Sequence, residues 1–275
     1  MQSAKSSDQT KSGVSSQEEE KTVTFLGKKR KGICGSTLKI IAITTMFIDH
    51  IGAALVEPYL ETLLKGNDYS AIYNSPWYVI YQLLRSIGRL GFPIFCFLLV
   101  EGFLYTRSKG KYIFRLALFC LISEVPFDLA FMHHVLEFSY QNVFFTLLIG
   151  MCVITVVDYI QHRDKMKVPV RYILEAVVII AGCVGATLLR TDYGAGGILT
   201  ITVMYFLRRH KVAEMYAGVL VLTLQQISEA YAFVATIPIA LYNGKRGLKM
   251  KYFFYIFYPA HLLLLAGIAK LIGVA

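Results

Sequence analysis

Nine stretches dominated by apolar residues follow one another along this chain from residue 38 onward, separated by short polar segments. A helix needs roughly 20 mostly apolar residues to cross a bilayer, and most of these stretches approach that length. The pattern predicts an all-α, polytopic helical membrane bundle of about nine to ten transmembrane helices. The predicted spans are Leu38–Val56, Trp77–Leu104, Tyr112–Phe131, Val143–Ile160, Tyr172–Leu189, Gly194–Leu207, Val212–Ile227, Ala230–Tyr242 and Phe253–Ile272.

The charges of the connecting segments alternate along the chain. Every second segment carries a cluster of Lys and Arg, as in Arg107–Lys111 and Arg208–Lys211, whereas the segments between them are acidic or mixed, as in Glu57–Asp68. Cytoplasmic loops are enriched in Lys and Arg. The alternation therefore predicts a multi-pass protein of the cell membrane with a cytoplasmic N-terminus and an extracytoplasmic C-terminus.

Composition supports a bilayer as the solvent of this chain. Hydrophobic residues make up 56% and charged residues 17% of the 275 residues, and the mean hydropathy is +0.54. The net charge of +10 is divided among clusters between apolar spans, which does not favour nucleic acid as a partner. Residues 1–31 are rich in Ser, Lys, Gln and Glu and predict a disordered cytoplasmic tail, which leaves residues 32–275 for the transmembrane domain.

Several ionisable residues interrupt the apolar stretches. Such groups are costly at membrane depth and usually functional. Arg85 and Arg89 are four residues apart, as are Glu124 and Asp128, so each pair shares one helix face. We expect the two arginines to neutralise the two carboxylates in one polar layer toward the outer face. The alternative is an ion-pair network that only holds two helices together.

Two histidines are candidates for proton transfer. Asp49 and His50 are adjacent in the first span, so their side chains point about 100° apart on a helix. His50 is the better base because imidazole has an unperturbed pKa near neutrality, and Asp49 is expected to orient a neighbour or bind substrate. His261 in the last span is the second candidate. For either histidine the alternative is a simple hydrogen bond to a helix carbonyl.

Motifs for metals and nucleotides are missing from the sequence. The histidines and cysteines lack zinc-type spacing, and neither a P-loop nor a dinucleotide fingerprint occurs, so no metal is predicted. Arg107, Lys245 and Arg246 lie in predicted cytoplasmic loops, where they would be able to hold the phosphates of an anionic cofactor. The alternative is that these residues serve only as topology signals.

Ordered motifs from about residue 37 to residue 262 resemble the TraX family of membrane proteins. They are KIIAITTMFIDHIG (39–52), IGRLGFPIFCFLLVEG (87–102), YIFRLALFCLISEVPFD (112–128), QNVFFTLLIG (141–150), DYG (192–194), LYNGKRG (241–247) and FYIFYPAH (254–261). That family is named for a conjugative-pilus protein that acetylates the N-terminus of pilin. The resemblance also places the chain near transmembrane acyltransferases such as heparan glucosaminide acetyltransferase.

The resemblance implies a membrane acetyltransferase with acetyl-CoA as the donor substrate. The acceptor would be extracytoplasmic: a glycan, a small molecule or a protein N-terminus, with a homodimer left open. The implied catalytic residues are His50 as base, Asp49, Arg89, Glu124, Asp128 and His261. The implied donor-binding residues are Arg85, Glu101, Asn142, Arg107, Lys245 and Arg246, and the implied acceptor-binding residues are Arg190, Asp192 and Tyr193.

Two further functions compete with this interpretation. A proton-coupled small-molecule transporter would use the same buried ionisable residues as a relay and substrate site. A membrane scaffold would need them only as an ion-pair lock. The spans show no evident two-half repeat, which disfavours the transporter.

Overall fold

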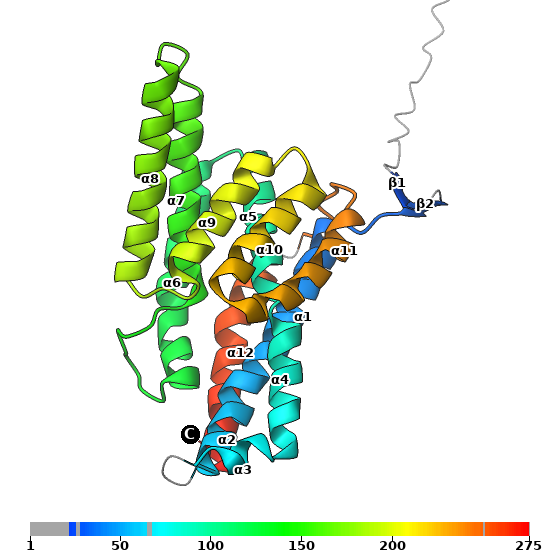
Figure 1. The fold of residues 1–275 in the computed structure, drawn as a ribbon, viewed down its shortest axis with the longest axis vertical. Helices are drawn as coiled ribbons and strands as arrows, with labels where there is room; N and C mark the ends of the chain where they lie inside the picture. Colours follow the sequence, from blue (N-terminus) through cyan, green and yellow to red (C-terminus); the bar gives the residue numbers. More distant parts are fainter. Residues whose placement is uncertain (1–21, 26–27, 65–67, 250, 275) are drawn as a thin grey trace, which may run out of the picture.

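The structure, a computed structural model, describes residues 22–25, 28–64, 68–249 and 251–274. It is helical apart from an antiparallel hairpin of β1 (Thr22–Phe25) and β2 (Lys28–Lys31). Most of the predicted disordered tail, residues 1–31, lies outside the described residues, so the tail stays a prediction. The helical elements (Figure 1) are α1 (Gly35–Ile51), the π-helix η1 (Gly52–Val56), α2 (Glu57–Thr62), α3 (Ser70–Tyr73), α4 (Pro76–Gly88), α5 (Gly91–Tyr105), α6 (Lys109–Phe131), α7 (Val143–Gln161), α8 (Val168–Leu188), α9 (Gly194–Leu207), α10 (Lys211–Gln225), the 3₁₀-helix η2 (Ile227–Ala235), α11 (Thr236–Ala240) and α12 (Lys251–Ile272).

Each predicted span coincides with helical structure, but fewer helices have the length and composition that a membrane crossing requires. Within the described residues, five helices are long and apolar enough to cross a membrane: Gly35–Thr62, Pro76–Tyr105, Val143–Gln161, Val168–Leu188 and Tyr252–Ile272. At 14 residues, α9 is only about 21 Å long, against the roughly 30 Å of a hydrocarbon core. The all-α membrane-type architecture is confirmed, whereas nine to ten spans are not.

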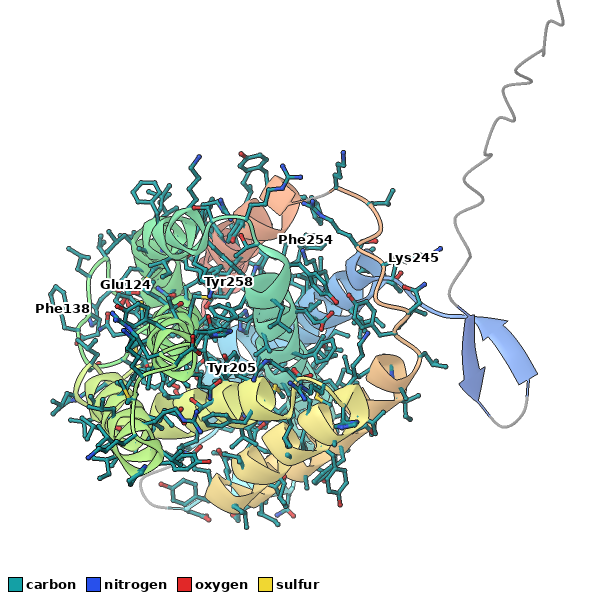
Figure 2. All side chains as sticks on the ribbon, turned by 90° about the horizontal axis from the view of Figure 1, so that it is seen from above. Glu124, Phe138, Tyr205, Lys245, Phe254 and Tyr258 are labelled. Atoms are coloured by element: carbon teal, nitrogen blue, oxygen red, sulfur yellow. The ribbon has the colours of Figure 1, made fainter. Side chains whose placement is uncertain are left out.

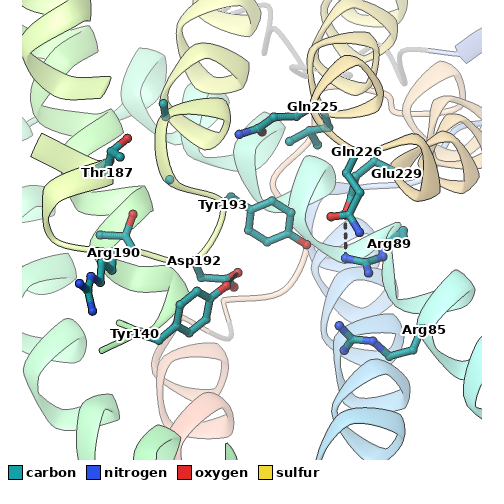
Figure 3. Close-up of a pocket in the computed structure, with 15 residues that line it drawn as sticks. Arg85, Arg89, Tyr140, Thr187, Arg190, Asp192, Tyr193, Gln225, Gln226 and Glu229 are labelled. Atoms are coloured by element: carbon teal, nitrogen blue, oxygen red, sulfur yellow. Dashed lines mark hydrogen bonds and ion pairs between the residues drawn. The ribbon is translucent and has the colours of Figure 1, made fainter. Parts of the chain in front are cut away.

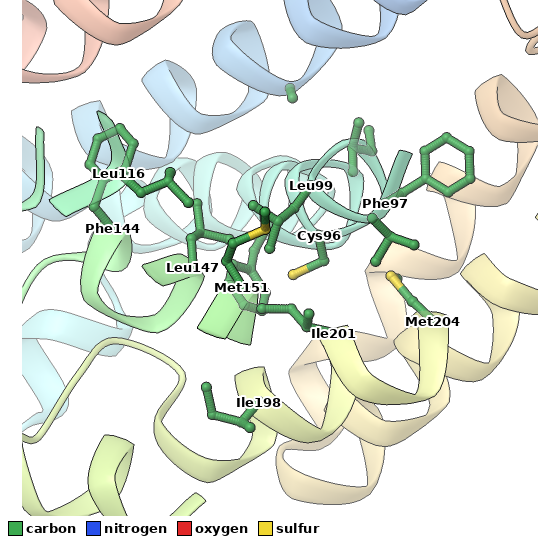
Figure 4. Packing of buried hydrophobic residues seen from close by; sticks show 14 of the residues in the cluster. Cys96, Phe97, Leu99, Leu116, Phe144, Leu147, Met151, Ile198, Ile201 and Met204 are labelled. Carbon is green, nitrogen blue, oxygen red and sulfur yellow. The ribbon is translucent and has the colours of Figure 1, made fainter. Parts of the chain in front are cut away.

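The centre of the bundle is α5, which packs against α1, α7, α9 and α10. Its side chains Cys96, Phe97 and Leu99 are buried among residues of α7 and α9 (Figure 4). Glycines allow the neighbouring helices to approach closely, because a Cβ at Gly150 or Gly218 would collide with side chains of α9. Small residues have this role in membrane helix packing generally.

The loops with basic clusters gather at one end of the molecule, the upper end in Figure 1, which we call the basic end. Seen from that end, α5 lies inside a ring of helices and Lys245 lies near the rim (Figure 2). The marked C-terminus lies at the opposite end from the start of α1 (Figure 1). The helices therefore alternate in direction as the loop charges predicted, and the side of the membrane on which each terminus lies stays a prediction.

Helix irregularities lie beside most of the predicted site residues. The π-helix η1 starts two residues after His50, and α4 ends where Arg89 caps it. Pro126 lies between Glu124 and Asp128 in α6. Proline and π-turns interrupt the hydrogen-bond ladder of a helix, and non-helical backbone at membrane depth is tolerated where protein buries it or where it lines a cavity.

Candidate active site

His50 of α1 and His261 of α12 face each other, although 211 residues separate them. His50 Nδ1 lies 2.7 Å from His261 Nε2, and the two rings stack with centroids 4.9 Å apart. Aromatic rings surround the pair: Phe131 packs edge-on against His50 at 5.2 Å, and Phe257 stacks on His261 at 4.9 Å. The structure thus brings together the two predicted proton-transfer candidates.

The hydrogen bonds of this pair define the tautomer of each ring. His261 Nδ1 lies 2.8 Å from the carbonyl oxygen of Phe257, which only accepts, so Nδ1 carries the proton. In the neutral ring, Nε2 of His261 then accepts the bond from Nδ1–H of His50. Nε2 of His50 is left with its lone pair. The free lone pair of the hydrogen-bonded pair therefore lies on Nε2 of His50.

The arginines of α4 do not pair with the carboxylates that the sequence suggested. Arg85 Nη1 lies 2.7 Å from Asp49 Oδ2, and Arg89 Nη1 lies 2.7 Å from Glu229 Oε1 of η2. The predicted quartet with Glu124 and Asp128 was therefore wrong. The reason for the different pairing is helix packing. Because α4 lies against α1 and η2, the two arginines meet the carboxylates of those elements.

Glu124 and Asp128 of α6 have local partners instead. Asn142 donates a side-chain hydrogen bond to Glu124 and a second one, at 2.9 Å, to the carbonyl oxygen of Cys120. Asp128 accepts a bond of 2.9 Å from the backbone N–H of Glu137. These contacts tie the start of α7 and the loop before it to α6. The α6 carboxylates thus have partners separate from those of the two arginines.

A polar cavity of about 620 Å³ lies where α8, α9, α10 and η2 meet α4 (Figure 3). We call it the central pocket. Five predicted site residues line it. They are Arg85, predicted to bind the donor; Arg89, predicted to be catalytic; and the predicted acceptor-binding residues Arg190, Asp192 and Tyr193. Its volume lies in the range of small-molecule sites.

Residues 190–193 form one wall of the central pocket and are held in an unusual backbone conformation. Arg190 and Tyr193 have φ values of +51° and +64°, in the left-handed region that non-glycine residues rarely occupy. The Tyr193 ring stacks on Phe92 with centroids 3.6 Å apart, which aims its hydroxyl toward Arg89 and Glu229 (Figure 3). Strained backbone of this kind clusters at functional sites.

Backbone bonds to the preceding loop fix the same wall. Gln141 N–H donates to Arg190 O at 3.0 Å, and Asp192 N–H donates to Gln141 O at 2.9 Å. Tyr140 donates its hydroxyl to Asp192 Oδ1 at 2.7 Å. Burial raises the pKa of Asp192, and the bond from Tyr140 and the nearby arginines oppose that rise.

Sequence reasoning missed six polar residues of the central pocket: Tyr140, Thr187, Thr191, Gln225, Gln226 and Glu229. Glu229 is 3% exposed, and its Oε2 has no hydrogen-bond partner among the described residues. Gln225 and Gln226 lie at the end of α10, within the predicted span Val212–Ile227, and Glu229 lies between that span and the next. A pair of amides followed by an acid within an apolar region was the available signal.

The remaining predicted donor-binding residues lie away from the central pocket. Buried Glu101 is near Tyr242 and Glu214, whereas Arg107, Lys245 and Arg246 are exposed in loops of the basic end. Among the described residues, no group of three or more His, Cys, Asp or Glu side chains is arranged to hold a metal ion.

Comparison with known proteins gives two kinds of match. The family model described as TraX protein matches residues 34–269. A probable fimbrial assembly protein FimC, serogroup H1, of Dichelobacter nodosus is 28% identical over 262 residues, covering 84% of this chain and 93% of that protein. An uncharacterized protein RP591 of Rickettsia prowazekii (strain Madrid E) is 23% identical over 206 residues, covering 75% and 68%. No solved structure matches the chain.

Proposed function

Because this chain belongs to the TraX family, we propose that it is a membrane acetyltransferase that moves the acetyl group of cytosolic acetyl-CoA to a hydroxyl or amine acceptor at the extracytoplasmic face. The family match and the long apolar helices make it a multi-pass membrane protein. The observation that carries the proposal is the His50–His261 pair, whose hydrogen bonds leave Nε2 of His50 as a base.

In the proposed reaction, the acceptor oxygen or nitrogen attacks the thioester carbon while His50 Nε2 takes the acceptor's proton. His261 accepts the hydrogen bond from His50 Nδ1–H and stabilises the imidazolium that forms. Arg85, held by Asp49, stabilises the oxyanion of the tetrahedral intermediate. The C–S bond then breaks, the thiolate takes the proton from His50, and the products are the acetylated acceptor and CoA.

The central pocket is the proposed acceptor site. Asp49 and His50 are neighbours on α1 whose side chains diverge: Asp49 holds Arg85 of the pocket wall, and His50 faces α12. The reacting end of the acceptor would lie between them. The name of the Dichelobacter relative connects that protein with fimbrial assembly, so the proposed acceptors include a protein N-terminus beside glycans and small molecules.

Purified protein in detergent tests this function. Acetyl-CoA should raise the melting temperature, because a ligand at 100 times its Kd stabilises the native state by about 2.7 kcal/mol. Addition of a suitable acceptor should release CoA thiol. His50→Ala should lower the transfer rate by about 10²- to 10⁴-fold, the usual contribution of a general base, and should leave acetyl-CoA binding intact.

The matched control is His134→Ala, which changes an exposed loop histidine and should keep full activity. Full turnover by His50→Ala would remove His50 from the mechanism. Absence of any acetyl-CoA binding would contradict the acetyltransferase itself.

A proton-coupled transporter is the second candidate, because interrupted helices beside a polar pocket are typical of transporter binding sites. The interruptions at η1 and between α4 and α5 fit that description. Proteoliposomes with an imposed pH gradient separate the two functions. Substrate uptake without CoA release would favour transport.

A further inference from the structure

A second cavity, of about 770 Å³, lies at the basic end between the start of α10 and α11. We call it the basic-end pocket. Apolar and aromatic side chains such as Val212, Tyr216 and Ile239 form much of its lining, and His210 and Lys211 add polar groups. Tyr242 closes one side, with the Lys211 ammonium 4.2 Å from the centre of its ring. The pocket therefore combines an apolar wall with cations.

The cations around this pocket lack carboxylate partners. In the described part of the chain, none of Arg209, Lys211, Lys245 and Arg246 has a carboxylate oxygen within 4.0 Å. Elsewhere at the basic end, Lys109 pairs with Asp158 at 2.5 Å. The buried Glu214 of α10 attracts Lys211 at longer range, but none of these four cations is held in an ion pair. Their positive charge can therefore meet an anion.

The loop that carries Lys245 and Arg246 is fixed in place. Lys245 O accepts a bond of 2.8 Å from Gly35 N–H, and Arg246 O accepts one of 3.0 Å from Ser36 N–H at the start of α1. Gly244, with φ +77°, lies so close to Lys211 that a Cβ would stand 3.4 Å from the lysine Nζ. The backbone of this loop is therefore held beside the ammonium group of Lys211.

We infer that the basic-end pocket binds the phosphorylated nucleotide end of the acetyl donor, an inference that rests on the proposed function. Lysine and arginine bind phosphate through charge-assisted hydrogen bonds, and the apolar wall suits the remainder of an extended CoA molecule. The two pockets also share a helix: Lys211 lines one and Leu222 the other. Eleven residues of α10 span about 16 Å, so this helix leads from the phosphate site toward the central pocket.

Calorimetric titration of the full-length protein in detergent tests the site, with CoA and 3′-dephospho-CoA as probes. Lys211→Gln and Lys245→Gln should each raise the Kd for CoA roughly tenfold, the effect of losing one charge-assisted contact. Lys245→Gln should leave the melting temperature unchanged, because Lys245 has no carboxylate partner among the described residues. Lys165→Gln is the matched control, because Lys165 is an exposed cation in the α7–α8 loop at the same end. It should bind CoA like the unaltered protein.

Three results would count against the inference or the function in different ways. Equal CoA affinity in all three variants, with transfer activity present, would overturn the site and leave the proposed function standing. No CoA binding by the unaltered protein would contradict the function. Binding of anionic phospholipid vesicles that depends on Lys211, together with CoA binding that does not, would assign the pocket to lipid phosphate and overturn the inference.

Discussion

The arginines of the central pocket and the cations of the basic-end pocket have opposite surroundings. Arg85 and Arg89 each contact a carboxylate at 2.7 Å, and the four side chains of these pairs are between 4% and 24% exposed. Lys211, Lys245 and Arg246 have no such partner within the described residues, and they lie at the end of the bundle.

This difference shows what burial requires of a charge. Inside the bundle a charge is costly unless a partner and hydrogen bonds replace water. At the end of the bundle water can solvate the charge, so no partner is needed and the cation stays available to a ligand. Arg85 and Arg89 thus have a structural role besides the one proposed for them, whereas Lys211, Lys245 and Arg246 have no carboxylate partner to lose among the described residues.

Arg89→Ala should have the largest effect on stability. Glu229, 3% exposed, would lose its ion-pair partner, and breaking a buried pair typically costs about 3–5 kcal/mol. The melting temperature in detergent and the transfer activity should both fall. Arg190→Ala is the control, because no carboxylate lies within 4.0 Å of Arg190 among the described side chains. Equal melting of the two variants would contradict the burial argument.

Arg85→Ala should cost less stability than Arg89→Ala. The side chains of Arg85 and Asp49 are 24% and 18% exposed, so water screens the unpaired Asp49. The loss should lie between the roughly 3–5 kcal/mol of a buried pair and the ~1 kcal/mol of an exposed one. Melting curves of Arg85→Ala and Arg89→Ala, measured under the same conditions, show which variant loses more stability. A larger loss for Arg85→Ala would reverse the assignment of the more deeply buried pair.

Tyr140→Phe should have the smallest effect, a shift in pH dependence. The hydroxyl of Tyr140 favours the charged form of Asp192 and thereby opposes the rise in pKa that burial causes. Without it the pKa of Asp192 rises further, so Asp192 becomes neutral at a higher pH. The acidic limb of the pH profile of kcat/KM for the acceptor should therefore move to higher pH. An unchanged profile would show that the ionisation of Asp192 does not affect turnover.

Much of the local architecture could be predicted from the sequence. The helix positions follow from runs of apolar residues, and the alternation of loops between the two ends follows from the placement of Lys and Arg. The divergence of Asp49 and His50 follows from the 100° rotation between adjacent residues of a helix. Each of these features depends on residues close together in the chain.

The pairing of side chains across the bundle could not be predicted from the sequence. The i, i+4 spacing of Arg85 and Arg89 gave their common face but not their partners, and their partner Glu229 was not recognised as a site residue at all. Both pairings depend on which helices lie against α4, and an ion pair between residues 140 positions apart leaves no local pattern.

The sequence by itself therefore determined the helices, their alternating directions and the residue types capable of proton transfer, because hydrophobic periodicity and charge act over a few turns of a helix. Only the tertiary structure decided that His261 is hydrogen-bonded to His50, that Asp49 and Glu229 hold the arginines, and that cations without a carboxylate partner gather beside α10. Hydrogen bonds and ion pairs act over about 3 Å, so their partners are decided by the packing of helices distant in sequence.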